Sequence, residues 1–173
     1  MNSDGIILNR THYRFEDSPS RCRRILHRND VFISTVRTYL KSIGFIEDEI
    51  NDLICSTGFC VISTTDEYNS KYLFYLTRSN WFISRVISLS EGVSYPSIQS
   101  DKLVDIKIVS PPLSEQQQIV DYLYEHTKKI ESTIEKETQR IELLKEYRQS
   151  LISNVVTGKI DVRDWKNDTK KLS

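Results

Sequence analysis

The chain has 173 residues, of which 38% are hydrophobic and 28% are charged, a composition typical of one globular domain or of one domain with an extension. Its 24 basic and 24 acidic residues give a formal net charge of zero, so no strong overall charge favours a nucleic-acid partner. We expect neither a membrane span nor a secretory signal, because no long apolar run is present. Three cysteines without a disulfide spacing agree with a cytoplasmic protein.

The charges are distributed unevenly along the chain. Residues 10–28 carry six arginines and two acidic residues, a local charge of +4. Residues 114–157 carry eight acidic and six basic residues, a local charge of −2. A basic first part and a mildly acidic last part indicate different partners for the two parts of the chain.

Residues 1–110 combine short strand and helix patterns. The predicted strands are Val31–Val36, Phe59–Ser63 and Asp105–Val109. The predicted helices are Glu47–Ile54 and a second that starts after Asn69 or Ser70, with a break near Asn80. We expect the aromatic residues of this second helix to lie in the core, namely Phe74, Tyr75, Trp81 and Phe82.

A clear boundary follows at Pro111-Pro112, because proline disfavours helix at the residue before it. Ser114 and Gln117 then have the spacing of a capping box. No proline or glycine occurs again before Gly158, so we predict one helix from about 114 to 157, roughly 65 Å long, and a polar tail over 158–173. The predicted fold class is therefore α+β, a small mixed domain followed by one long C-terminal helix of coiled-coil type.

Apolar residues recur along this helix every seven positions, which predicts a seam that packs against another long helix. Eight of the eleven seam positions are apolar: Val120, Leu123, Ile130, Ile134, Ile141, Leu144, Leu151 and Val155. The polar exceptions, Thr127, Glu137 and Arg148, would fix the register of the pair. The alternative is a single amphipathic helix that folds back onto its own domain.

Local signatures of catalysis are missing from the sequence. The five glycines are too scattered for a phosphate-binding loop, and Asp105-Ile106-Lys107 lacks the upstream acid of a nuclease motif. The spacing of Cys55 and Cys60 does not suit zinc. The sequence therefore shows no local catalytic signature, and we predict no metal and no cofactor.

Several segments together resemble the specificity subunits of type I restriction-modification systems. Val109–Tyr122 (VSPPLSEQQQIVDY) is similar to that family's junction between target-recognition domain and helix, and Glu146–Val162 (EYRQSLISNVVTGKIDV) to the end of its helix. Pro19–Leu26 (PSRCRRIL), Asp30–Leu40 (DVFISTVRTYL) and Gly92–Ile98 (GVSYPSI) are similar to parts of its recognition domain. The resemblance covers residues 15 to 165, and its specificity lies in the order and spacing of the motifs.

The resemblance implies a DNA-recognition component that is not itself an enzyme and that acts with separate methyltransferase and restriction subunits on double-stranded DNA. The family's usual chain has two recognition domains and two long helices, so this chain resembles a half-length or truncated member, with residues 1–110 as a shortened recognition domain. Its second half would come from another copy through the long helix, or from a different half-subunit. The alternative is a vestigial or silent specificity fragment that acts only as a coiled-coil interaction module.

Basic residues of the recognition domain are the candidates for DNA contact, because Arg and Lys neutralise phosphates. The candidate set is Arg21, Arg23, Arg24, Arg28, Arg37, Lys41 and Tyr95. Each basic residue could instead be a solvated surface charge or part of an ion pair. Arg37 could brace the domain, and Tyr95, which precedes Pro96, could be structural.

Overall fold

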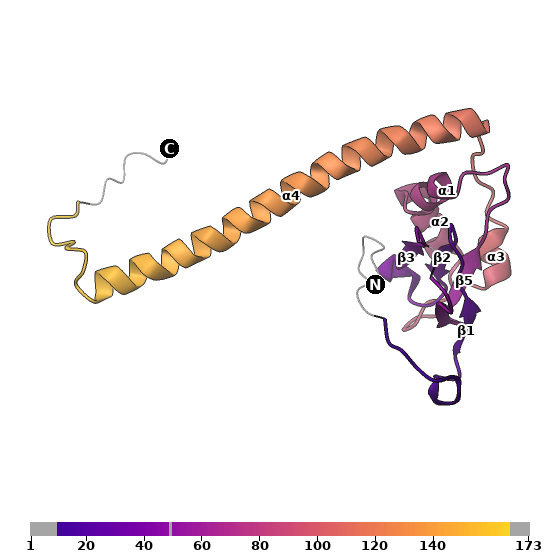
Figure 1. The fold of residues 1–173 in the computed structure, drawn as a ribbon, viewed down its shortest axis with the longest axis horizontal. Helices are drawn as coiled ribbons and strands as arrows, with labels where there is room; N and C mark the ends of the chain where they lie inside the picture. The colour runs from indigo at the N-terminus through magenta and orange to yellow at the C-terminus, as the bar shows by residue number, and fades with distance from the viewer. Residues whose placement is uncertain (1–9, 49, 167–173) are drawn as a thin grey trace. The chain divides into compact units, whose positions relative to one another are not determined.

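The computed structural model describes residues 10–48 and 50–166, and the chain divides into one compact unit that ends at Leu123 and another that begins at Tyr124. The architecture is α+β, as predicted (Figure 1). The strands are β1 (Cys22–Ile25), β2 (Val31–Ser34), β3 (Ile43–Phe45), β4 (Ile54–Ser56) and β5 (Phe59–Ile62). The helices are α1 (Ser70–Thr77), α2 (Asn80–Leu89), α3 (Ser100–Val104) and α4 (Leu113–Val156), with short 3-10 turns η1 (Phe15–Asp17) and η2 (Thr38–Leu40).

The strands form a three-stranded antiparallel sheet in the order β3-β2-β5 and a separate antiparallel ribbon of β1 and β4. Successive residues of a strand point to opposite faces. In the central strand β2, Val31 and Ile33 belong to one buried cluster and Phe32 to another. Both faces of this sheet are therefore covered, and this explains why the β2 sequence is apolar without alternation.

Helices α1 and α2 supply side chains to the larger cluster, among them Leu73 and Phe82. The predicted break near Asn80 is confirmed, because Ser79 is extended and its hydroxyl accepts a hydrogen bond from the backbone N–H of Phe82, 3.2 Å away. Phe82 is buried as predicted. The prediction for Trp81 was wrong, since its side chain is 54% exposed on the outer side of α2.

Two predicted elements are wrong. Glu47–Ile54 contains no helix among its described residues; the segment turns at Asp52, whose positive φ of 58° is a conformation that aspartate tolerates well, and then enters β4. Asp105–Val109 is not a strand. Its residues Ile106 and Ile108 do pack against the larger core cluster, but no strand pairs with this segment.

Helix α4 begins at Leu113, directly after the two prolines. The predicted capping box is not formed, because the Gln117 side chain bonds instead to Asn69 and Asp121, at 2.8 Å each. Gln116 is 1% exposed; its side-chain N–H donates to the Pro111 carbonyl and its side-chain oxygen accepts from the Asn69 N–H, both at 2.8 Å. This glutamine fixes the start of α4 to the N-cap of α1.

Val120 corrects the predicted seam at its first position. Its side chain is 4% exposed in the single chain, within the compact unit that ends at Leu123, so it packs in that unit and not against a second helix. The first turns of α4 are thus part of the recognition domain.

Farther along α4 the side chains are no longer buried: every residue from 128 to 153 is exposed. The helix ends close to the predicted position. Gly158, with a φ of 75°, takes the left-handed conformation that commonly ends helices, and its N–H donates to the Val155 carbonyl at 3.1 Å. Over the described residues, no helix has the length and apolar character needed to span a membrane.

Replacing Gln116 by Ala should lower the free energy of unfolding by about 1–3 kcal/mol, because the part-buried Asn69 N–H and Pro111 carbonyl would lose their partner. Urea titration followed by circular dichroism measures this change. Gln118→Ala, at an exposed position two residues away, is the matched control and should change stability by less than about 0.5 kcal/mol. Equal stability of the two variants would show that Gln116 does not fix the junction.

Candidate nucleic-acid interface

Arg37 and Tyr95 come from segments far apart in the sequence, and the structure brings them together. The Arg37 guanidinium lies over the Tyr95 ring, 4.7 Å from its centroid. The Arg37 N–H donates to the Pro96 carbonyl at 2.8 Å, and Val36 forms an isolated bridge with Ser97. Both side chains remain exposed. A stacked guanidinium and a phenol at one surface position offer both charge and a flat face to a ligand.

The loop that carries Arg37 is held in an uncommon conformation. Arg37 and Lys41, at either end of η2, have φ values of 50° and 54°, which few residues other than glycine adopt. Between them, buried Thr38 shares a hydrogen bond with the Ser90 hydroxyl at 2.9 Å. Such a backbone is maintained only where surrounding contacts hold it, and it is frequent at binding sites.

Tyr95 lies in a tight loop between Glu91 and Ser97, whose backbones exchange hydrogen bonds of 2.8 and 2.9 Å. Gly92 has a φ of 105°, and a Cβ there would come within 3.2 Å of the Tyr95 carbonyl oxygen. Glycine is therefore required for this loop to close. Lys102 of α3 forms an ion pair with Glu91 at the base of the loop.

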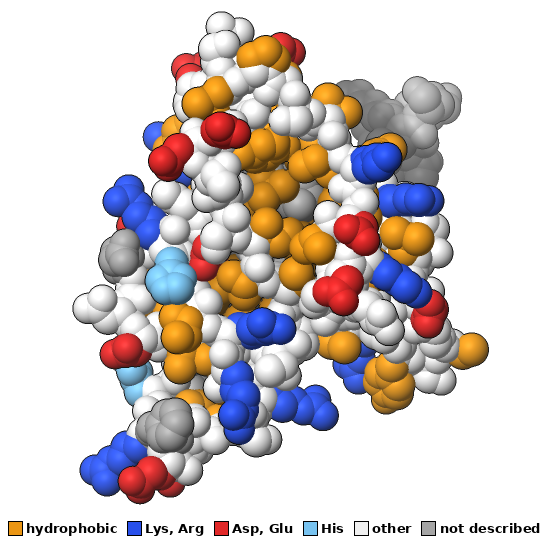
Figure 2. All heavy atoms as spheres, turned by 90° about the vertical axis from the view of Figure 1, so that its right-hand side faces the viewer, with side chains coloured by type: hydrophobic (Ala, Val, Ile, Leu, Met, Phe, Trp, Pro, Cys, Tyr) orange, Lys and Arg blue, Asp and Glu red, His pale blue; other side chains and the backbone are white. Residues whose placement is uncertain are grey.

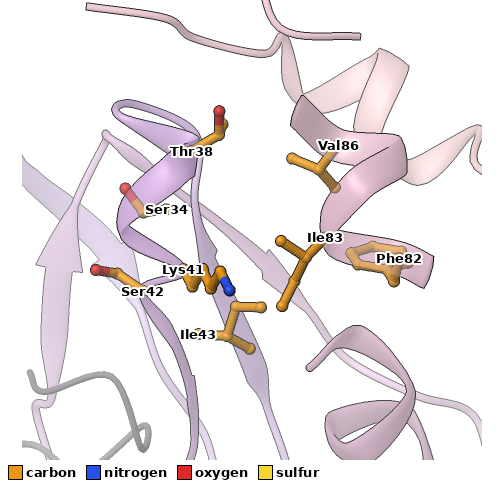
Figure 3. Close-up of a pocket in the computed structure, with 8 residues that line it drawn as sticks. All are labelled: Ser34, Thr38, Lys41, Ser42, Ile43, Phe82, Ile83 and Val86. Atoms are coloured by element: carbon orange, nitrogen blue, oxygen red, sulfur yellow. The ribbon is translucent and has the colours of Figure 1, made fainter. Parts of the chain in front are cut away.

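Lys41 differs from the other basic candidates because its stem lies against the domain. A cavity of about 10 Å³, room for one water at most, is lined by Lys41 together with Thr38, Ile83 and Val86 among others. Figure 3 shows the Lys41 side chain running toward the side chains of Ile43 and Ile83. Lys41 therefore lines this cavity, and the cavity itself is too small to hold a ligand.

A second group of basic residues lies in and beside β1: Arg21, Arg23, Arg24 and Arg28. All four are exposed, and none forms an ion pair with a carboxylate of the described residues. The pairing of β1 with β4 shifts between Cys22 and Arg24, and the Arg23 Nε donates to the Ser20 carbonyl at 2.8 Å. The shift re-aims the side chains at this point of the strand.

Backbone hydrogen bonds connect only one end of β1 to the Arg37–Tyr95 pair. The Thr57 N–H donates to the Arg21 carbonyl at 2.7 Å, and the next residue, Gly58, accepts from the Thr35 N–H at 2.9 Å. Thr35 in turn accepts from the Ile98 N–H at 2.9 Å. Arg28 lies beyond the opposite end of β1. Of the predicted residues, Arg37 and Tyr95 are therefore brought into contact, while Arg21, Arg23, Arg24 and Arg28 lie in and beside β1.

One face of the protein carries both signs of charge (Figure 2). Figure 2 shows one face on which hydrophobic side chains gather in the middle, with Lys and Arg interspersed with Asp and Glu around them. Tyr39 is 50% exposed and Val93 is fully exposed in the two loops that meet at Arg37 and Tyr95. Sequence reasoning missed Val93, for which the turn residue Gly92 before it was the one available signal. A small number of arginines, not a broad basic surface, would therefore contact a polyanion.

Metal ligands and thiols are the remaining chemistry to consider among the described residues. Among residues 10–48 and 50–166, no three His, Cys, Asp or Glu side chains are grouped as metal ligands. The cysteines are free thiols. Burial raises the pKa of Cys55 to about 11 and also raises the pKa of Cys60, so both stay protonated at neutral pH. A protonated thiol is neither a nucleophile nor a metal ligand.

The predicted seam of α4 is exposed beyond the recognition domain. Ile130, Ile134, Ile141 and Leu144 are each more than half exposed, Leu151 is 41% exposed, and Leu123 and Val155 are half-buried. Tyr147, which the seven-residue pattern did not include, is 65% exposed beside them. Large apolar side chains in a continuous exposed row indicate a protein–protein contact.

A model of the family described as "Type I restriction modification DNA specificity domain" matches residues 19–143. The chain belongs to this family. Its membership agrees with the resemblance found in the sequence motifs and with the prediction of a non-catalytic specificity component.

Curated relatives carry the same designation. The chain is 30% identical over 115 residues to the type I restriction enzyme EcoKI specificity subunit of Escherichia coli, which covers 65% of this chain and 25% of that protein. It is 29% identical over 103 residues to the MjaVIII specificity subunit of Methanocaldococcus jannaschii, which covers 60% of this chain and 23% of that protein. The chain thus spans about a quarter of the length of these relatives.

Solved structures share the fold. The HsdS subunit from Thermoanaerobacter tengcongensis matches with a TM-score of 0.70 and 26% identity, over 96% of this chain and 42% of that one. A chain from a structural study of complex assembly and conformational transition of the type I R-M system matches with a TM-score of 0.72, the same identity and the same coverage.

Cys55 should react slowly with iodoacetamide at pH 8. A pKa of about 11 in place of 9.0 leaves about a hundredfold less thiolate at that pH. Mass spectrometry of timed samples measures the modification of each cysteine, with the urea-unfolded chain as control. The rate should rise with pH toward 11. Equal rates for Cys55 in the folded and unfolded chains would contradict the protected environment.

Proposed function

We propose that this chain is a sequence-specific DNA-recognition subunit of a type I restriction-modification complex, which directs separate methyltransferase and restriction subunits to a split site in double-stranded DNA. Its own chemistry is binding, and the methylation and cleavage steps belong to those other subunits. The complex would act in the cytoplasm. The observation that carries the proposal is the family match over residues 19–143, which includes the recognition domain and most of α4.

DNA contact would have two layers. Four exposed arginines that form no ion pair with a described carboxylate are suited to phosphates, which supply salt-dependent affinity: Arg21, Arg23, Arg24 and Arg28. Arg37 and Tyr95 are held rigidly by their loops and are suited to a base edge or to the backbone beside it. The Lys41 ammonium would add a phosphate contact.

Helix α4 would set the distance between two recognition domains. At 1.5 Å per residue its 44 residues extend about 66 Å, close to two turns of B-DNA at about 34–36 Å each. One domain alone reads one half of a split sequence. A second domain, at the far end of a paired helix, would read the other half, and the helix pair would also offer a surface to the methyltransferase.

Replacing both Arg23 and Arg24 by Ala should weaken DNA binding by about tenfold on every sequence and reduce the salt dependence, because two phosphate contacts are lost. The measurement is fluorescence anisotropy of the chain reconstituted with its methyltransferase, using duplexes selected from a random library, at several salt concentrations. The oligomeric state should not change.

The matched control removes the same charge elsewhere on the domain surface. Arg85→Ala with Lys107→Ala, both at exposed positions, should leave affinity and salt dependence unchanged. If the complex selects no sequence from the library, or if binding does not vary with salt, the chain is not a recognition subunit and the alternative of a coiled-coil interaction module gains support.

A further inference from the structure

The two charged residues of the α4 seam, Glu137 and Arg148, are the starting point. Both lie within the exposed part of the helix, among Ile134, Ile141 and Leu144. In the single chain Glu137 approaches only Arg140, at 3.7 Å, in an exposed intrahelical pair. A charged residue in a seam is costly when it faces an apolar partner, so the best pairing of this helix must satisfy both charges together.

We propose that α4 pairs with the α4 of a second copy of this chain, antiparallel, in the register that places Glu137 opposite Arg148 of that copy and Arg148 opposite its Glu137. This inference rests on the proposed pairing of two recognition domains through the helix. In it, Ile141 faces Leu144, Ile134 faces Leu151 and Ile130 faces Val155. Every apolar seam residue between 130 and 155 therefore meets an apolar one, and the only polar layer is an ion pair that occurs twice by symmetry.

Neighbouring registers fail this test. A slip of one heptad in one direction places Glu137 against Ile141 and Arg148 against Ile130, and a second heptad places Glu137 against Ile134 and Arg148 against Leu123. A parallel pair in register places Glu137 against Glu137 and Arg148 against Arg148, where like charges repel. The seam charges thus select both the direction and the register.

The residues beside the seam agree with the same register. Arg140 and Tyr147 directly precede the seam residues Ile141 and Arg148. In an antiparallel pair of helices, residues at this kind of position lie beside one another across the pair. Arg140 then lies beside Tyr147 of the second copy, and Tyr147 beside its Arg140. Both side chains are exposed in the single chain, and a guanidinium over a phenol ring is a favourable contact. The overlap of 26 residues, about 39 Å, extends over nearly four heptads.

Charge reversal tests this register without DNA. Glu137→Arg alone and Arg148→Glu alone each place like charges opposite one another at two symmetric sites, so each should weaken the dimer by tenfold or more. Mixed together, the two variants should form a heterodimer of near native affinity, because each arginine then faces a glutamate. The measurement is sedimentation equilibrium of the full chain at low salt, with one variant carrying a fluorescent label.

Control variants carry the same changes off the seam. Glu135→Arg and Lys136→Glu, at exposed positions on the outer side of α4, should dimerise as the native chain does. Recovery in the mixture also shows that the single variants fold. A monomeric native chain, unchanged single variants, or a mixture that stays monomeric would each overturn the register. Loss of DNA selection with an intact dimer would instead refute the DNA-binding role alone.

Discussion

The apolar row of α4 has no packing surface among the described residues of the unit that begins at Tyr124, and the proposed assembly follows from this constraint. Every residue from 128 to 153 is exposed in the single chain, and the seam isoleucines and leucines in this stretch are 41% to 60% exposed. A helix with a long apolar row is stabilised mainly by packing that row against another surface. The proposed pairing of α4 would bury this row and would make the first compact unit one part of a larger complex.

The first compact unit, by contrast, buries its own apolar residues in two clusters. The central strand β2 is covered on both faces, and buried Gln116 connects the first turn of α4 to the N-cap of α1 through two hydrogen bonds. If the start of α4 could move relative to α1, the helix could not hold the domain at a defined distance. On the domain surface, Arg37 is held in a left-handed conformation beside Tyr95. Rigid support is what a site that discriminates among sequences requires.

Local signals in the sequence were sufficient for some elements and not for others. The long helix, the break near Asn80 and the strands β2 and β5 were predictable, because heptads, caps and β-branched runs act within a few residues. The helix at 47–54 and the strand at 105–109 were not realised, since a turn at Asp52 and the absence of a pairing strand depend on the tertiary fold. For the same reason the sequence named Arg37 and Tyr95 separately but could not show their contact, and it assigned Val120 to the seam although the domain buries it.

Distances between spin labels measure the pairing of α4 most directly. Single cysteines at Gln139 and Ser153, on the outer side of the helix in a chain whose native cysteines are replaced by alanine, give one label pair per dimer in pulsed electron resonance. In the antiparallel register proposed above, the axial offset between the two copies is about 10 Å at Gln139 and about 32 Å at Ser153. The account predicts a clearly longer distance at Ser153. Equal distances at both positions, as in a parallel pair, or no dipolar coupling at all, would contradict it.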